Sequence, residues 1–274
     1  MKKSKILWAI SVLIIFFNVL FYAFRFGGDS VLLYVSDLLP VACSFISAVC
    51  LLIAFRAFAS MDYIKFSWLL LFFGLLLFFL AESVYAVLEI VFEQNLDENW
   101  PSVADYLWCA GYVPQFACLV MLLRGYLKTG LPLGNIKTYM ALSAVFIVLC
   151  GSIIYYLLIP IVVDPESDLL TKIFSLFYPI ADLFVVAPAL LLMYITNIIG
   201  RGRLARPWMF IAIGFIFFTA SDLLYSYLSW QGLYGSGNFI DIGWNAGYLL
   251  IALSAIYQKE LLESVSEGWK DEIQ

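Results

Sequence analysis

Eight stretches of predominantly apolar residues, each long enough to cross a bilayer as a helix, constrain this chain more than any other feature. A hydrocarbon core of about 30 Å requires about 20 residues of α-helix. Of the 274 residues, 64% are hydrophobic and only 13% are charged, which does not fit a soluble domain. We therefore predict an all-α, polytopic protein of the cell (cytoplasmic) membrane. The predicted transmembrane helices cover residues 6–25, 31–55, 66–92, 103–124, 138–163, 169–199, 207–229 and 239–258.

Basic residues are distributed unevenly over the predicted loops. With the N-terminus inside, thirteen of the fifteen Lys and Arg residues lie on the inner side, and only Arg25 and Lys172 lie outside. By the positive-inside rule, we predict that both termini are cytoplasmic. The inner basic residues are Lys2, Lys3, Lys5, Arg56, Lys65, Arg124, Lys128, Lys137, Arg201, Arg203, Arg206, Lys259 and Lys270. The outer loops carry the acids Glu93, Asp97, Glu98, Asp164, Glu166 and Asp168.

A motif of one acid and two aromatic residues occurs once in each half of the chain. The pattern D-x-x-W-x-A-G-Y covers residues 105–112 and returns at 241–248. Because each half has an even number of spans, both copies should insert in the same orientation, related by a pseudo-twofold axis along the membrane normal. We predict two parallel four-helix repeats, 1–130 and 131–258, followed by a cytoplasmic tail, 259–274. Three further pairs match between the halves: Glu82 with Asp222, Tyr85 with Tyr225, and Asp37 with Asp182.

Six acids of the predicted spans lie at a similar depth. Each is about 25 to 28 Å above the basic residue at the inner end of its helix, near the outer interface. If unpaired and ionised, six such groups could cost on the order of 10 kcal/mol. Two outer basic residues cannot balance them, so the counterparts are protons, metal cations, an organic cation, or hydrogen bonds from Tyr and Trp. The six acids are Asp37, Glu82, Asp105, Asp182, Asp222 and Asp241.

Aromatic residues share a helix face with several of these acids. Trp108 and Tyr112 follow Asp105 at i+3 and i+7. A carboxylate beside aromatic faces suits an ammonium ligand, whereas several oxygen donors suit calcium or magnesium. We predict outward-facing ligand binding by an acidic and aromatic cluster in each half, and equal depth leaves open whether the two clusters converge. The candidate residues are Asp37, Glu82, Tyr85, Asp105, Trp108, Tyr112, Asp182, Asp222, Tyr225, Asp241, Trp244 and Tyr248. If the ligand is a divalent cation, the candidate metal ligands are Glu82, Asp105, Asp222 and Asp241.

Helix capping is an alternative role for two of the acids. Ser102 with Asp105, and Asn238 with Asp241, have the spacing of an N-cap residue and an acid three positions later. A structural role of this kind fits these two aspartates as well as ligand binding does.

The other four acids lie inside helices, where no cap is available. Asp37 and Asp182 also fit a neutral carboxyl group that is held by a neighbouring hydroxyl, and Glu89 is a secondary candidate without an acidic counterpart. Gly111 and Gly247 are expected to allow close helix contact.

The repeated motif resembles the membrane-embedded N-terminal sensory modules of bacterial and archaeal diguanylate cyclases and histidine kinases. The matching positions are Glu82, Tyr85, Asp105, Trp108, Gly111 and Tyr112, and Asp222, Tyr225, Asp241, Trp244, Gly247 and Tyr248. This resemblance implies a sensor. About fifteen residues follow the last span, so we expect no catalytic output domain and a cytoplasmic or membrane partner that carries the signal.

A second, weaker resemblance concerns residues 219–254, which are similar to part of the YhhN-type lysoplasmalogenases. It implies an intramembrane lipid hydrolase, in which acids activate water directly or through a metal. However, Glu82 departs from the Gly-Asp pair that this family would have in the first half. A cation-coupled transporter is a third alternative.

Histidine is absent from the chain, which removes the usual axial ligand of haem and the usual general base. We therefore expect neither haem nor a histidine-dependent membrane hydrolase. We expect a sensor rather than an enzyme, without retinal. We also expect a lipid bilayer around the protein, no nucleic acid, and a cationic or lipid-like small ligand.

Overall fold

The computed structural model describes residues 3–96, 100–128, 133–165, 167–200, 204–235 and 237–273, with side chains for all of these except 200 and 266–273. This part of the chain is almost entirely helical and contains no strand. The prediction of an all-α protein is therefore confirmed. Six loop charges used above lie outside the described residues, namely Lys2, Asp97, Glu98, Glu166, Arg201 and Arg203, and so does the side chain of Lys270.

Each predicted span coincides with a helix. The fifth predicted span consists of two α-helices joined by a π-helical turn, η1 (Ile154–Leu158). It is therefore a continuous helical segment from residue 136 to 163. The helices are α1 (Lys3–Phe24), α2 (Gly28–Ala57), α3 (Tyr63–Ile90), α4 (Val103–Lys128), α5 (Ile136–Ile153), α6 (Ile159–Val163), α7 (Leu169–Gly200), α8 (Ala205–Trp230) and α9 (Asp241–Ile273).

Short polar side chains determine where several helices begin. The backbone N–H of Lys65 donates to Asp62 Oδ1 at 2.8 Å, and that of Thr171 donates to Asp168 Oδ1 at 2.8 Å. Each bond satisfies one of the N–H groups that have no partner inside the first turn of a helix. The bond from Thr171 also lowers the pKa of the exposed Asp168 carboxyl, because it stabilises the charged form.

Among the residues that the structure describes, seven helices are long and apolar enough to cross a membrane, which supports a multi-pass membrane protein. The predicted span 239–258 falls in α9, whose first two turns carry Asp241, Asn245 and Tyr248. All three side chains are buried against neighbouring helices. Because it is surrounded by protein, α9 needs less apolar surface than a helix that faces lipid. An eighth crossing stays a prediction.

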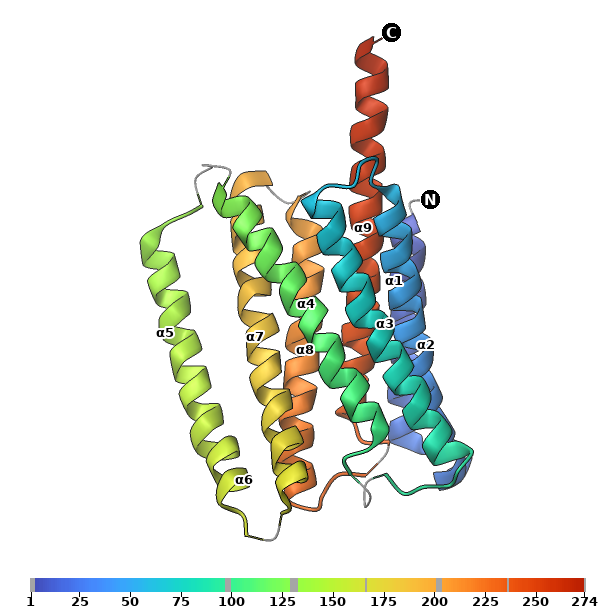
Figure 1. The fold of residues 1–274 in the computed structure, drawn as a ribbon. Coiled ribbons are helices and arrows are strands. Elements are labelled where there is room, and N and C mark those ends of the chain that lie inside the picture. Colours follow the sequence, from blue (N-terminus) through green and yellow to red (C-terminus); the bar gives the residue numbers. More distant parts are fainter. Residues whose placement is uncertain are drawn as a thin grey trace.

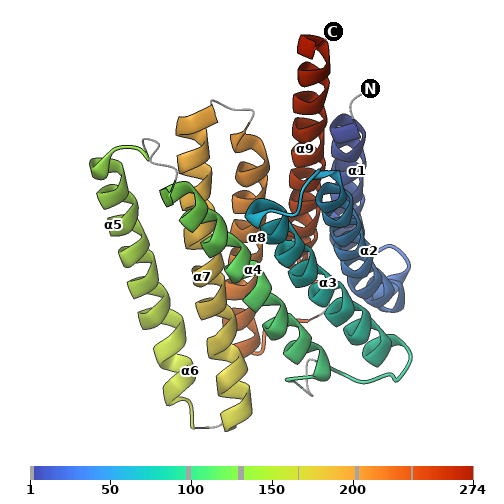
Figure 2. The same cartoon turned by 45° about the horizontal axis from the view of Figure 1, so that its top comes forward.

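Six helices form a closed ring. Each packs against the next in the order α2, α3, α4, α7, α8 and α9, and α9 in turn packs against α2. Outside this ring, α1 packs on α9 and α5 on α7, and Figures 1 and 2 place these two helices at opposite edges of the bundle. As a result α2, α3 and α4 occupy places equivalent to those of α7, α8 and α9.

Two pairs of glycines bring helix backbones together in matching places. A Cβ atom at Gly111 would lie 2.9 Å from the carbonyl oxygen of Gly74, and one at Gly247 would lie 3.1 Å from that of Gly214. The first pair joins α4 to α3, and the second joins α9 to α8. The predicted role of Gly111 and Gly247 in close helix contact is therefore confirmed.

The outer helix α1 is attached to α9 by polar contacts near both of its ends. The amide of Asn245 donates to Asn18 Oδ1 at 3.0 Å. Toward the N-terminus, the backbone N–H and the hydroxyl of Ser4 donate to the two carboxylate oxygens of Glu260, each at 2.9 Å. Through these bonds the position of α9 is coupled to that of α1.

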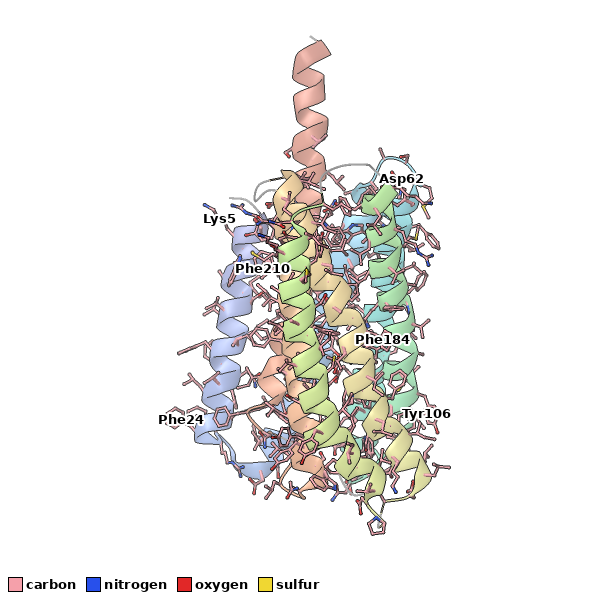
Figure 3. All side chains as sticks on the ribbon, turned by 90° about the vertical axis from the view of Figure 1, so that its left-hand side faces the viewer. Lys5, Phe24, Asp62, Tyr106, Phe184 and Phe210 are labelled. Carbon is pink, nitrogen blue, oxygen red and sulfur yellow. The ribbon has the colours of Figure 1, made fainter. Side chains whose placement is uncertain are left out.

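Both ends of the described chain lie on the same side of the bundle (Figure 1). Figure 3 shows Lys5 and Asp62 at this end of the helices, and Phe24 and Tyr106 at the opposite end. The last helix continues without interruption to Ile273 and projects beyond the bundle, so the predicted tail from residue 259 is an extension of α9. A cytoplasmic location for this end is still a prediction.

Candidate functional site

A cavity of about 120 Å³ is lined by residues from the first turns of α4 and α9. These turns lie at the end of the bundle that is opposite to the two termini (Figure 1). Of the twelve predicted ligand-binding residues, all but Asp182 line the cavity. The equal depth of these residues did not require them to meet, yet the ring turns them toward one space. The predicted lining residues are Asp37, Glu82, Tyr85, Asp105, Trp108, Tyr112, Asp222, Tyr225, Asp241, Trp244 and Tyr248. The other lining residues are Ser36, Pro40, Phe78, Trp100, Tyr178, Phe218 and Tyr234.

Two tyrosine hydroxyls cross from one half of the ring to the other. Tyr248 on α9 donates to Glu82 Oε1 on α3 at 2.6 Å. Tyr112, its counterpart on α4, lies 2.9 Å from Asp222 Oδ2 on α8. Each half thus supplies the tyrosine that contacts the helix acid of the other half, as expected for two units related by a pseudo-twofold axis.

The Tyr112 hydroxyl also lies 2.8 Å from Asp182 Oδ1. A phenol carries one proton and can donate to only one of the two carboxyl groups. For both contacts to be hydrogen bonds, one of Asp182 and Asp222 must carry a proton. Trp244 supplies a further donor, because its Nε1–H lies 2.6 Å from Asp222 Oδ1. Asp182 itself is fully buried behind Tyr112 and does not reach the cavity.

Asp105 caps its helix and also lines the cavity. Its Oδ2 accepts from the backbone N–H of Ser102 at 2.7 Å and from the Ser102 hydroxyl at 3.0 Å. Its Oδ1 accepts from the Tyr178 hydroxyl at 2.7 Å and from Trp100 Nε1 at 3.2 Å. The capping alternative is therefore realised at this position, in addition to a place in the cavity wall.

Asp241 has the corresponding position on α9, with different partners. Its Oδ2 accepts from the backbone N–H of Gly237 at 3.0 Å, and its Oδ1 accepts from the Tyr234 hydroxyl at 3.1 Å. The predicted capping partner was Asn238. The backbone N–H of Asn238 also bonds to the Asp241 carboxyl group, so this partner is retained and Gly237 is added to it. Gly237 adopts a positive φ of 82°, which turns the chain sharply before the helix.

Asp37 lies in the cavity wall on α2 and is 5% exposed. The Ser36 hydroxyl lies 3.3 Å from its Oδ1. Its Oδ2 is buried and accepts no hydrogen bond from an N–H or hydroxyl group of the described residues. The Glu89 carboxyl group lies within hydrogen-bond reach of the Asp37 carboxyl group, and Glu82 is near enough to interact with Asp37 electrostatically. The secondary candidate Glu89, which is 7% exposed, therefore lies next to Asp37, in the first half of the site.

Aromatic rings form matching walls around the acids. Tyr85 and Trp108 have ring centroids 5.8 Å apart, and Tyr225 and Trp244 are separated by the same distance. Trp108 also bonds to Glu82, in the way that Trp244 bonds to Asp222. These walls offer ring faces and N–H groups to a ligand between the two halves.

No Lys or Arg side chain lies in the described part of the cavity wall. At this end of the bundle, Arg25 is 3.3 Å from Asp29 in an exposed ion pair, and the ammonium of Lys172 donates to the carbonyl of Val162. Neither cation is available to the cavity. The carboxyl groups therefore require protons or a cationic ligand as their counterpart.

The predicted metal ligands do not form a metal centre. Among the residues that the structure describes, no three acidic or cysteine side chains are arranged to hold a metal ion. Glu82 and Asp222 have tyrosine and tryptophan partners, and Asp105 and Asp241 accept hydrogen bonds at their helix starts. Hydrogen-bond donors rather than a shared ion thus surround the four carboxyl groups.

Five aromatic residues of the cavity wall were not predicted, and three of them, Trp100, Tyr178 and Tyr234, donate hydrogen bonds to the acids. Tyr178 lies four residues before Asp182 on α7, and this spacing on one helix face was the signal that could have identified it. Trp100 and Tyr234 lie in the two loops before α4 and α9 and have no helical periodicity. Their contacts with Asp105 and Asp241 follow only from the path of these loops.

No known protein family, curated protein or solved structure matches this chain.

Proposed function

We propose that this protein is an integral membrane sensory or ligand-binding module that takes up an organic ammonium ion and signals through a partner. The observation that carries the proposal is the single cavity in which acids and aromatic residues from both halves meet without a basic side chain. A cation that enters this space gains carboxylate partners and aromatic faces together.

An ammonium ion suits the site better than a divalent metal ion. Calcium requires six to eight oxygen ligands, and magnesium requires near-octahedral geometry. The described residues provide no group of three such ligands. The Tyr85–Trp108 and Tyr225–Trp244 walls instead match the preference of alkylammonium groups for ring faces.

The last helix offers a route by which ligand binding could be signalled. Asp241, Trp244 and Tyr248 lie near the first turns of α9, and the same helix runs without interruption to Ile273. Its 33 residues correspond to about 50 Å of α-helix. A shift of α9 at the cavity would therefore be transmitted to the end that projects beyond the bundle.

The same proposal includes the finer topology. We place all eight helical segments across the cell membrane as two parallel four-helix units, with both termini in the cytoplasm. The distribution of basic residues supports this orientation. The matching contacts of Gly111 and Gly247, and of Tyr112 and Tyr248, support the two-unit arrangement.

A thermal-shift measurement on the purified protein in detergent tests the proposed ligand class. The panel contains primary and quaternary alkylammonium ions, polyamines, calcium, magnesium and lysolipids. We expect one ammonium class to stabilise the folded protein, by about 2.7 kcal/mol at a concentration 100 times its Kd. The double variant Glu82→Gln, Asp222→Asn should lose this stabilisation, because both acids that contact the cross-half tyrosines become neutral.

A matched control variant also neutralises one glutamate and one aspartate, but at positions outside the cavity wall. Asp29→Asn with Glu93→Gln neutralises one aspartate and one glutamate that are exposed and outside the cavity wall. This control should keep the full ammonium-dependent shift. The proposal is wrong if no ammonium ion stabilises the folded protein. Release of a product from lysolipids would favour the hydrolase alternative, and ammonium uptake into proteoliposomes would favour a carrier.

A further inference from the structure

The two halves of the cavity differ at one pair of matched acids. In the second half, the Tyr112 hydroxyl lies between Asp182 and Asp222, at 2.8 and 2.9 Å. The matched acids of the first half are Asp37 and Glu82. There the counterpart of Tyr112, Tyr248, donates to Glu82 at 2.6 Å and makes no hydrogen bond to Asp37 within the described part of the chain.

The difference leaves Asp37 without a tyrosine donor. Its Oδ2 is buried and accepts no hydrogen bond from an N–H or hydroxyl group of the described residues, its carboxyl group lies against that of Glu89, and the Asp37 side chain lines the cavity. Asp182 Oδ2 is also without a partner, but Asp182 is 0% exposed and lies behind Tyr112, out of reach of the cavity. A buried carboxyl oxygen without a donor destabilises the folded protein, and does so more strongly when it is charged. Of these two aspartates, only Asp37 lines the cavity and can therefore contact a ligand there.

We propose that a ligand ammonium group binds between Asp37 and Glu82 and bridges these two carboxyl groups, as the Tyr112 hydroxyl bridges Asp182 and Asp222 in the other half. This inference rests on the proposed function and assigns the ammonium to one half of the cavity. Glu89 interacts with Asp37 from the side and adds a third carboxyl group to this subsite. The corresponding position of the second half is Ser229, so the extra acid is confined to the first half.

The subsite also selects the kind of ammonium ion. A group that replaces a donor for Asp37 while contacting Glu82 needs N–H bonds directed at two carboxyl groups. A primary ammonium has three such bonds, whereas a quaternary ammonium has none. The neighbouring Tyr85–Trp108 wall, which joins the helix of Glu82 to α4, would contact the alkyl part of the ligand. We therefore expect a primary alkylamine in its protonated form.

Isothermal titration calorimetry with two matched probes tests the subsite. The probes are n-butylammonium and butyltrimethylammonium, which carry the same charge and the same butyl chain. In the wild-type protein, the primary ion should bind about tenfold to a hundredfold more tightly, because only it can donate to the carboxyl groups. Equal affinity for the two probes would overturn the inference and leave the proposed function intact.

Two matched variants assign the location. Asp37→Asn should weaken n-butylammonium binding by at least about tenfold, because it removes the charge that faces the cavity. Asp182→Asn, the same change in the other half, should weaken it less, since Tyr112 already occupies that place. Equal losses in both variants would overturn the subsite. If neither probe binds the wild-type protein, and no other member of the ammonium panel does, the proposed function itself fails. The comparison of the two probes needs no variant, so it decides the question even if Asp37→Asn does not fold.

Discussion

Gly111→Ala is expected to lower the midpoint of thermal unfolding by several degrees. The added Cβ would lie 2.6 Å from Cδ1 of Phe78 and 2.9 Å from the backbone oxygen of Gly74. Backbone cannot move aside like the end of a flexible side chain, so α3 and α4 must separate. Forcing an extra methyl group into a packed contact costs about 1–3 kcal/mol. For a chain of this size, each kcal/mol corresponds to about 2–4 °C.

Gly151→Ala is the matched control for this substitution. Gly151 is also inside a helix, α5, but a Cβ there would meet no atom within 4 Å. Alanine is the better helix former by about 0.8–1.0 kcal/mol, so this variant should be as stable as the wild type or slightly more stable. Equal destabilisation by the two substitutions would contradict the close contact of α3 with α4. The midpoints of thermal unfolding of both variants and the wild type are measured by circular dichroism in the same detergent and at the same heating rate.

Tyr112→Phe is expected to have the second large effect, because one hydroxyl serves two buried carboxyl groups. Its removal leaves Asp182 and Asp222 without their common partner, while the ring still fills the same space. A buried acceptor that loses its donor costs about 1–3 kcal/mol. Tyr248→Phe removes one donor from one carboxyl group, Glu82, which keeps its bond to Trp108, and should therefore cost less. Chemical or thermal unfolding of the two variants measures the difference.

A rescue variant separates the loss of hydrogen bonds from other effects of the substitution. In Tyr112→Phe with Asp182→Asn, the new amide can donate to Asp222 in place of the missing hydroxyl. The double variant should therefore regain part of the stability that Tyr112→Phe loses. If Asp182→Asn adds its own loss to that of Tyr112→Phe, the three groups do not share a hydrogen-bond network. Ligand binding is measured in parallel, because Tyr112 also lines the cavity.

Membership of the site was more predictable than its detailed contacts. The fixed spacing of Trp108 and Tyr112 from Asp105 indicated a shared helix face, and all three line the cavity. By contrast, Asp37 and Asp182 occupy matching positions of the two halves in the sequence, but only Asp37 lines the cavity. Asp182 lies behind Tyr112 and is fully buried. A repeat in the sequence indicates equivalent positions, but small differences in packing decide which side chain faces the cavity.

The sequence by itself determined the helices and the depth of the acids along them. Inside a bilayer every backbone polar group must be bonded within its own segment, so an apolar stretch of about 20 residues has helix as its available structure. The rise of 1.5 Å per residue then sets the depth of each carboxyl group.

Only the tertiary structure decided that these carboxyl groups meet. Equal depth leaves the direction of each side chain around the bundle open, and that direction depends on the order and rotation of the helices in the ring. The ring places Tyr112 against Asp222 and Tyr248 against Glu82, and it brings Tyr178 to Asp105 across more than seventy residues of chain. Contacts of this kind form between distant segments, so no local pattern of residues specifies them.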